Sequence, residues 1–138
     1  MKPVLVDSSV LLDIVTHDRI WFGWSSRALV AAANEAPLVV NPLIYAEVSI
    51  GFSRIEDLEK TMPASVFRRE TLPYEAAFLA GKAFLKYRRG GGPRATPLPD
   101  FYIGAHAAVS GFRILTRDVR RYRTYFPSVE LIAPRQPR

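Results

Sequence analysis

Acidic residues stand within two positions of the ends of two short, mainly apolar runs, and they are the residues of this chain best suited to chemistry. Asp7 follows the run Val4–Val6, and Asp118 comes soon after the run 113–116. Apolar runs without polar alternation indicate strands that are buried on both faces of a parallel sheet. Open α/β sheets bind ligands beyond the carboxyl ends of their strands. We therefore predict that Asp7 and Asp118 open into one crevice.

A third acid, Glu47, lies on a predicted helix, for which Asn41 supplies the N-cap and Pro42 the first position. Its neighbours at helical spacing are expected to face the core, which leaves Glu47 half buried at the border of their stripe. A half-buried carboxylate destabilises the folded protein unless a cation pairs with it. No lysine or arginine lies within six positions of Glu47. We therefore expect Glu47 to belong to a site. The residues of the core-facing stripe are Leu43, Ala46 and Ile50.

The fourth acid, Asp100, is expected in the first turn of a helix that begins at Pro99 and ends before Gly111. A carboxylate in a first turn is equally suited to capping the helix and to binding a metal ion, so Asp100 alone does not distinguish these two roles. The preceding segment 90–97 is rich in glycine but matches no nucleotide-binding pattern, and we expect a mobile loop there.

Carboxylates gathered in one crevice repel one another unless a cation neutralises them. Ligation by two or three carboxylates is typical of Mg²⁺ or Mn²⁺, and the chain has no cysteine that would supply a thiolate ligand. Such an ion activates water beside a phosphate, which is the chemistry of phosphodiester hydrolysis. The predicted metal ligands and catalytic acids are Asp7, Glu47, Asp100 and Asp118, with Thr116 and Ser8 or Ser9 as accessory hydroxyls.

Plain structural roles are the alternatives for several of these polar residues. Asp7 would also suit as the cap of the next helix, although Ser8 or Ser9 serves that purpose equally well. His106 is expected to pack in the core or an interface rather than to act in catalysis. His17 is expected in a loop without an evident partner.

The remaining elements follow from apolar periodicity and from turn residues. Both tryptophans lie in the segment 20–24, which is expected to be a loop that either covers the core or binds a partner. The pattern as a whole predicts an α/β fold with a central, mostly parallel sheet flanked by helices. The predicted elements are helices at 10–16, 25–35 and 57–60, strands at 38–40 and within 65–72, and a long helix that begins at Pro73.

Length and charge limit the classes of function. A chain of 138 residues is the size of one domain, so residues 1–138 are expected to form a single domain. Nineteen Lys and Arg residues against thirteen Asp and Glu give a net charge of +6, which favours a polyanionic partner such as nucleic acid. The absence of cysteine and of a membrane-spanning segment predicts a soluble, cytoplasmic protein. The arginines that are candidates for holding a nucleic-acid backbone are Arg88, Arg89, Arg94, Arg117, Arg120, Arg121 and Arg123.

Taken together, these motifs resemble a PIN-domain ribonuclease of the VapC toxin type over nearly the whole chain. The resemblance implies a PIN-like three-layer sandwich, endonucleolytic cleavage of RNA that depends on Mg²⁺ or Mn²⁺, a homodimer or a hetero-oligomer with the antitoxin, and inhibition by a cognate VapB-type antitoxin. The acids at 7, 47, 100 and 118 fall on the acidic positions of that family, and Thr116 falls on an accessory hydroxyl position. The motifs that carry the resemblance are Asp7–Ser9, Glu47, the segments 99–107 and 115–118, and the continuation to Pro127.

Two other classes of protein share part of this pattern. A phosphate-accepting receiver domain also gathers acids at strand ends, but it normally needs adjacent acids after its first strand and a lysine on a late strand. Here Asp7 is flanked by Val6 and Ser8, and the late strand offers Arg113 instead. A non-catalytic RNA-binding or antitoxin-sequestered scaffold is the second alternative, and the basic charge suits it equally well.

Overall fold

The computed structural model describes residues 1–91 and 98–135, so part of the predicted glycine-rich loop, and Arg94 with it, lies outside the described residues. Five strands form one sheet in the order β3-β2-β1-β4-β5, and all neighbouring strands are parallel. The predicted α/β class is therefore confirmed. The strands are β1 (Val4–Val6), β2 (Leu38–Val40), β3 (Phe67–Arg69), β4 (Arg113–Leu115) and β5 (Leu131–Ile132).

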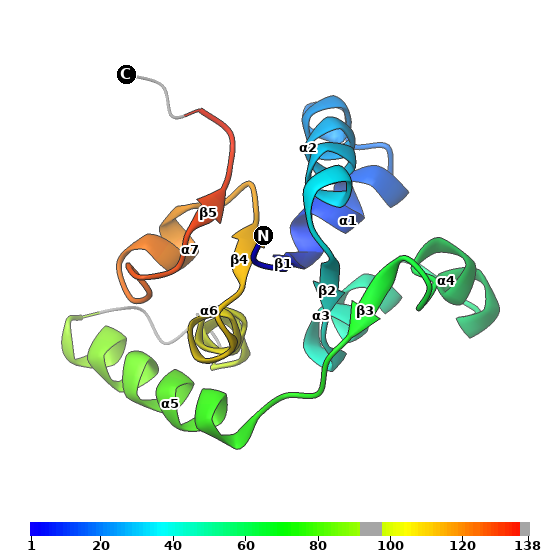
Figure 1. Cartoon of the computed structure of the whole chain (residues 1–138). Helices are drawn as coiled ribbons and strands as arrows, with labels where there is room; N and C mark the ends of the chain where they lie inside the picture. The colour runs from blue at the N-terminus through cyan, green and yellow to red at the C-terminus, as the bar shows by residue number, and fades with distance from the viewer. Residues whose placement is uncertain (92–97, 136–138) are drawn as a thin grey trace.

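Helices lie on both sides of the sheet and make the three-layer sandwich that the sequence predicts. Figure 1 shows α1 and α2 on one side of the sheet and α5 and α6 on the other. Every strand of an all-parallel sheet needs a crossover connection, and the helices fill these connections. The helices are α1 (Ser8–Val15), α2 (Phe22–Glu35), α3 (Pro42–Ser49), α4 (Ile55–Thr61), α5 (Tyr74–Arg89), α6 (Pro99–Ser110) and α7 (Arg120–Arg123).

The order of the strands creates a topological switch point between β1 and β4. The chain leaves β1 toward β2 and β3 on one side and returns to β4 and β5 on the other. Val6 pairs with Leu115, and the backbone N–H of Asp7 donates to the Leu115 carbonyl at 2.9 Å. Asp7 and the residues after β4 therefore lie side by side, at the place where sheets of this kind bind ligands.

Three helices begin earlier than their sequence patterns predict. α1 begins at Ser8, so Asp7 occupies the N-cap position, yet its side chain makes no capping hydrogen bond. α2 begins at Phe22 and takes in much of the predicted loop. Trp24 packs against the core from this helix, whereas Ile20 before it is 80% exposed. α4, predicted at 57–60, also begins earlier, at Ile55, and the side chain of its N-cap residue Arg54 makes no capping hydrogen bond.

The helix that carries Glu47 starts as predicted, but it buries a different face. The Asn41 side chain accepts a hydrogen bond from the Ile44 N–H at 2.9 Å, which confirms the predicted N-cap. Ile44 and Val48 are fully buried, whereas Ile50 of the predicted stripe is 85% exposed. Apolar residues occur almost all round this helix, so spacing alone did not select the buried face. Glu47 is nevertheless half buried, as expected.

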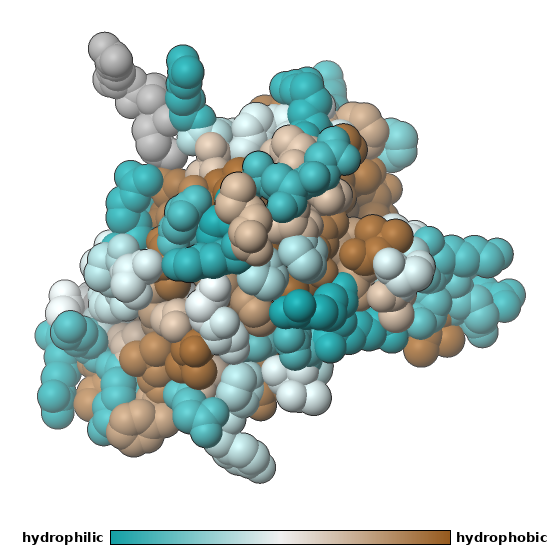
Figure 2. All heavy atoms as spheres, in the orientation of Figure 1, coloured by the Kyte–Doolittle hydropathy of each residue, from teal (hydrophilic) through white to brown (hydrophobic). Residues whose placement is uncertain are grey.

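The surface combines charged and apolar side chains. On α5, Tyr74 is 90% exposed and Phe78 is 69% exposed, while Lys82 lies over the Phe78 ring. Figure 2 shows apolar and hydrophilic atoms side by side over this part of the molecule. Among the described residues, no helix has both the length and the apolar character that crossing a membrane requires.

Gly104 lets α6 pack closely against the ring of Phe126, and this contact leads to a prediction about stability. A Cβ atom at Gly104 would lie 2.3 Å from Cδ2 of Phe126, a ring that is buried in the core. We expect Gly104→Ala to lower the free energy of unfolding by roughly 1–3 kcal/mol through overpacking. Urea unfolding measures this loss.

A matched control for this substitution lies on α5. No atom lies within 4 Å of a Cβ built at Gly81, so Gly81→Ala should raise stability by about 0.5–1 kcal/mol through helix propensity. Equal stability of the Gly104→Ala protein and the wild type would contradict the close packing of α6 against Phe126.

Candidate active site

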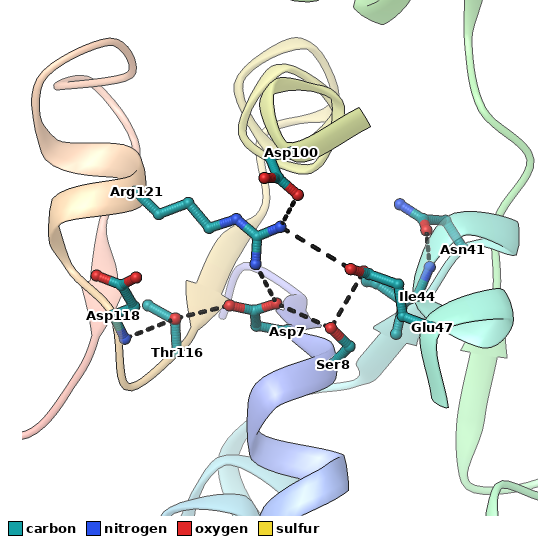
Figure 3. Close-up of polar contacts among 9 residues, drawn as sticks. All are labelled: Asp7, Ser8, Asn41, Ile44, Glu47, Asp100, Thr116, Asp118 and Arg121. Atoms are coloured by element: carbon teal, nitrogen blue, oxygen red, sulfur yellow. Dashed lines mark hydrogen bonds and ion pairs between the residues drawn. The ribbon is translucent and has the colours of Figure 1, made fainter. Parts of the chain in front are cut away.

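Three carboxylates from three different elements converge on one guanidinium, that of Arg121 (Figure 3). Arg121 Nη1 lies 3.5 Å from Asp7 Oδ1, and Nη2 lies 3.9 Å from Glu47 Oε2. Nη2 also donates a hydrogen bond to Asp100 Oδ1. The structure thus brings together Asp7, Glu47 and Asp100 of the predicted set, and a cation from the C-terminal part of the chain lies among them.

Hydroxyl groups hold Asp7 in place. Thr116 Oγ1 donates to Asp7 Oδ2 at 2.8 Å and accepts the backbone N–H of Asp118 at 3.0 Å. Ser8 Oγ lies 3.1 Å from Glu47 Oε1 and 3.5 Å from Asp7 Oδ1. Thr116 therefore ties the end of β4 to Asp7, and Ser8 links Asp7 to α3.

Asp118 lies to one side of this cluster. Figure 3 shows its carboxylate next to Thr116 rather than at the guanidinium. Asp118 does line a pocket of about 470 Å³ together with Asp100 and Arg121. All four predicted acids are thus found at the carboxyl edge of the sheet, but Asp118 makes no ion pair with Arg121 among the described contacts.

Burial and charge shift the protonation equilibria of this site. Burial raises the pKa of the Glu47 carboxyl, and the Arg121 charge and the Ser8 hydrogen bond offset this rise only in part. Burial opposes the charged form of Arg121, yet the nearby Tyr122 and the three carboxylates together raise the pKa of its guanidinium above the usual value. The site is therefore strongly negative, and it holds its one central cation firmly.

A buried tyrosine lies under the acids. Tyr122 has no solvent exposure, and its hydroxyl makes no hydrogen bond of ordinary geometry within the described residues. Burial, followed by the charge of Asp7, raises the pKa of this hydroxyl well above its usual value. Tyr122 is consequently a neutral group that lies near Asp7 and can donate a proton in a hydrogen bond.

The donor set suits a divalent ion, although the arrangement is not that of a preformed metal site. Mg²⁺ and Mn²⁺ prefer carboxylate oxygens, which the residues around Arg121 offer. Within the described ranges, no group of three or more His, Cys, Asp or Glu residues is arranged to hold a metal. The guanidinium lies where the carboxylates converge, so an ion bound by all three requires Arg121 to move.

Sequence reasoning missed the pairing of Arg121 with the acids. By its charge alone Arg121 is a candidate for RNA binding, and Glu47 lacks a cation nearby in the sequence. That lack was the one available signal that a cation from a distant segment had to reach Glu47. Arg117 of the same group is engaged elsewhere, because its Nε donates to buried Asp13 at 2.9 Å and its guanidinium lies over the Trp21 ring.

His106 has a structural position, as expected from the sequence. It is buried, and its Nδ1 lies 3.0 Å from the Asn41 amide nitrogen. The Asn41 oxygen is already the acceptor for the N–H of Ile44, so the amide N–H₂ donates to an unprotonated Nδ1. His106 thereby connects α6 to the N-cap of α3, the helix that carries Glu47.

This contact predicts a pH dependence of stability. Burial lowers the pKa of His106, and the charge of Glu70 only partly opposes this effect. The folded protein then binds fewer protons than the unfolded chain just below about pH 6.5. The stability from this group is complete above that pH and is lost as the pH falls toward the lowered pKa. Chemical unfolding at a series of pH values measures the loss.

A glutamine at position 106 does not titrate, so His106→Gln should remove this part of the pH dependence. His17 is exposed and stacks on Phe22, and His17→Gln serves as the matched control that keeps the pH dependence. An unchanged pH dependence in the His106→Gln protein would count against the role assigned to this contact.

The sequence matches a known protein family over most of its length. The family profile described as PIN domain matches residues 4–127, so the chain belongs to the PIN domain family. A comparison with curated proteins finds no match.

The fold is similar to solved chains of toxin-antitoxin complexes. A chain of VapBC2 from Rickettsia felis, solved with a promoter DNA fragment, has a TM-score of 0.71 and 13% identity, covering 95% of this chain and 98% of that one. A chain of VapBC-1 from nontypeable Haemophilus influenzae has a TM-score of 0.72 and 14% identity, with coverages of 95% and 97%. A toxin-antitoxin complex from Klebsiella pneumoniae gives 0.67 and 22% identity, with coverages of 91% and 94%. At these sequence identities, the similarity to the solved structures shows a shared fold and no more.

Proposed function

We propose that this chain is a VapC-type endoribonuclease that depends on a divalent metal ion. The observation that carries the proposal is the convergence of Asp7, Glu47 and Asp100 on one cation at the switch point of the sheet. The acids at this edge repel one another unless a cation offsets their charge, which favours a role in binding a metal ion. Membership of the PIN family supports a nuclease.

The proposed roles follow from the contacts of each residue. Asp7, Glu47 and Asp100 would hold the ion, and Asp118 completes the acidic edge of the pocket. When bound, the ion, Mg²⁺ or Mn²⁺, would supply an acidified water and would offset negative charge on the scissile phosphate. Thr116 fixes the orientation of Asp7, and Ser8 keeps Asp7 and Glu47 together. In the protein without metal, Arg121 offsets part of the negative charge of these carboxylates.

The proposal includes a VapB-type antitoxin as partner and a homodimer, or a hetero-oligomer with that antitoxin, in the cytoplasm. The likeness to chains from VapBC complexes supports the partner. The net charge of +6 is consistent with an RNA substrate and with an acidic inhibitor segment. Co-expression with the gene encoded beside it, followed by size-exclusion chromatography, tests whether a stable complex forms.

The position of Arg121 favours one second candidate, a non-catalytic scaffold that binds RNA or antitoxin. In that case Arg121 is the permanent counter-ion of the acids, and no metal enters. The two candidates differ in metal binding, because a permanent ion pair leaves the protein indifferent to Mn²⁺ while the nuclease must bind it.

The deciding experiment is cleavage of a defined RNA by the purified chain. We expect internal cuts with Mg²⁺ or Mn²⁺ and none after addition of EDTA, with activity restored by excess metal. Sequencing of the RNA ends after brief expression identifies the substrate. RNA cleavage that survives EDTA would refute the metal-dependent mechanism, and RNA binding without any product would favour the scaffold.

A further inference from the structure

The pocket beside the acids has an aromatic wall, which we define as Tyr87, Phe101 and Tyr125. These rings come from α5, from α6 and from the segment after α7. The centroid of Tyr125 lies 5.6 Å from that of Phe101 and 6.0 Å from that of Tyr87, both in edge-to-face geometry. Such contacts fix the orientation of rings, and buried Phe101 supports the two partly buried tyrosines. The wall is therefore held in shape before any ligand arrives.

Two arginines line the same pocket, and they differ in what they contact. Arg121 is engaged by carboxylates at the inner end. Arg120 is exposed, and no ion pair or hydrogen bond joins it to another residue within the described part of the chain. Its guanidinium is consequently available to an anion from solution. Asp100 and Asp118 occupy the pocket as well, and the Arg121 ion pair offsets the charge of Asp100.

The size and chemistry of the pocket fit one nucleotide of a single strand. Its volume of about 470 Å³ falls in the range of small-ligand sites. An unpaired base stacks on aromatic rings, and a guanidinium binds phosphate with two parallel hydrogen bonds. Bases inside a duplex are not available for such stacking.

We propose that this pocket is a nucleotide subsite of the nuclease, which holds one unpaired nucleotide of the RNA next to the scissile phosphate. The base packs against Tyr125 and Tyr87, and the phosphate binds Arg120. The assignment rests on the proposed function for its substrate, since Asp100 and Asp118 line the same hollow. Aromatic rings stack with any of the bases, so this subsite selects single-stranded RNA rather than a particular base.

Binding of a short labelled RNA in EDTA tests the subsite without cleavage, with fluorescence anisotropy as the readout. Tyr125→Ala should weaken binding about 10-fold, and Tyr125→Phe should bind like the wild type because the ring remains. Arg120→Gln, at an exposed position, should weaken binding and lower the salt dependence by about one phosphate contact. Tyr74→Ala and Arg19→Gln are exposed controls outside the pocket, and both should bind like the wild type.

Each outcome separates the subsite from the nuclease proposal. Wild-type binding by both Tyr125→Ala and Arg120→Gln overturns the subsite even where the protein cleaves RNA. Weakened binding in these variants, with no cleavage by the wild type in any metal, supports the subsite and refutes the nuclease. Equal affinity for the same RNA annealed to its complement overturns the assignment to an unpaired base.

Discussion

Asp100→Asn is expected to slow metal-dependent RNA cleavage at least about 100-fold, because a neutral amide no longer offers a full charge to the ion. The side chain of Asp100 is 26% exposed in the first turn of α6, so asparagine occupies the same space without overpacking. Initial rates on a defined RNA measure the loss. Circular dichroism and the unfolding midpoint show whether the fold is retained.

The control for this substitution is an acid far from the site. Asp57 is exposed in the first turn of α4 and lines none of the pocket beside the acids. Asp57→Asn should therefore cleave like the wild type. A folded Asp100→Asn protein that retains more than half of the wild-type rate would exclude Asp100 from the catalytic machinery.

Arg121→Met is expected to destabilise the metal-free protein by roughly 2–4 kcal/mol, because it leaves the buried carboxylate of Asp7 without its counter-ion. The loss is smaller than for a fully buried cluster because Glu47 and Asp100 are partly exposed and are screened by water. Mn²⁺ should restore most of the lost stability, and the variant should bind Mn²⁺ more tightly than the wild type. Thermal unfolding in EDTA and in Mn²⁺, together with calorimetric titration, measures both effects.

Arg120→Met is the matched control, since this neighbouring arginine is exposed and takes no part in the ion pairs of the acids. Its stability should change by less than about 0.5 kcal/mol, with or without metal. Equal stability of Arg121→Met and the wild type in EDTA would show that the acids do not depend on this cation. If Mn²⁺ changed the stability of neither Arg121→Met nor the wild type, Arg121 would be the permanent counter-ion of the acids. That result would favour the scaffold over the nuclease.

The strands beside the acids, and the starts of the helices that carry Glu47 and Asp100, were predictable because their signals are local. Val4–Val6 has no polar alternation, and such a run is stable only when both faces are covered. Asn41 before Pro42 supplies an N-cap and a residue that lacks an N–H, whatever the rest of the chain does. The two-residue strand β5 escaped prediction, since two partly buried residues give no periodic pattern.

The buried face of α3 shows where local patterns stop being informative. Several spacings of apolar residues fit this helix equally well, and the structure buries Ile44 and Val48 instead of Leu43, Ala46 and Ile50. Packing against the neighbouring helices and strands determines which face of α3 is buried. Glu47 reaches the site because it lies near the border of the buried face under either register.

The sequence by itself determined which acids follow strands or open helices, because strand burial, capping and turn chemistry act over a few neighbouring residues. Only the tertiary structure decided what those acids contact. Arg121 and Asp7 are 114 positions apart, and they meet because β1 and β4 pair at the switch point and α7 follows β4 directly. No local pattern encodes such a contact, since it depends on strand order, and strand order is settled by the packing of the whole chain.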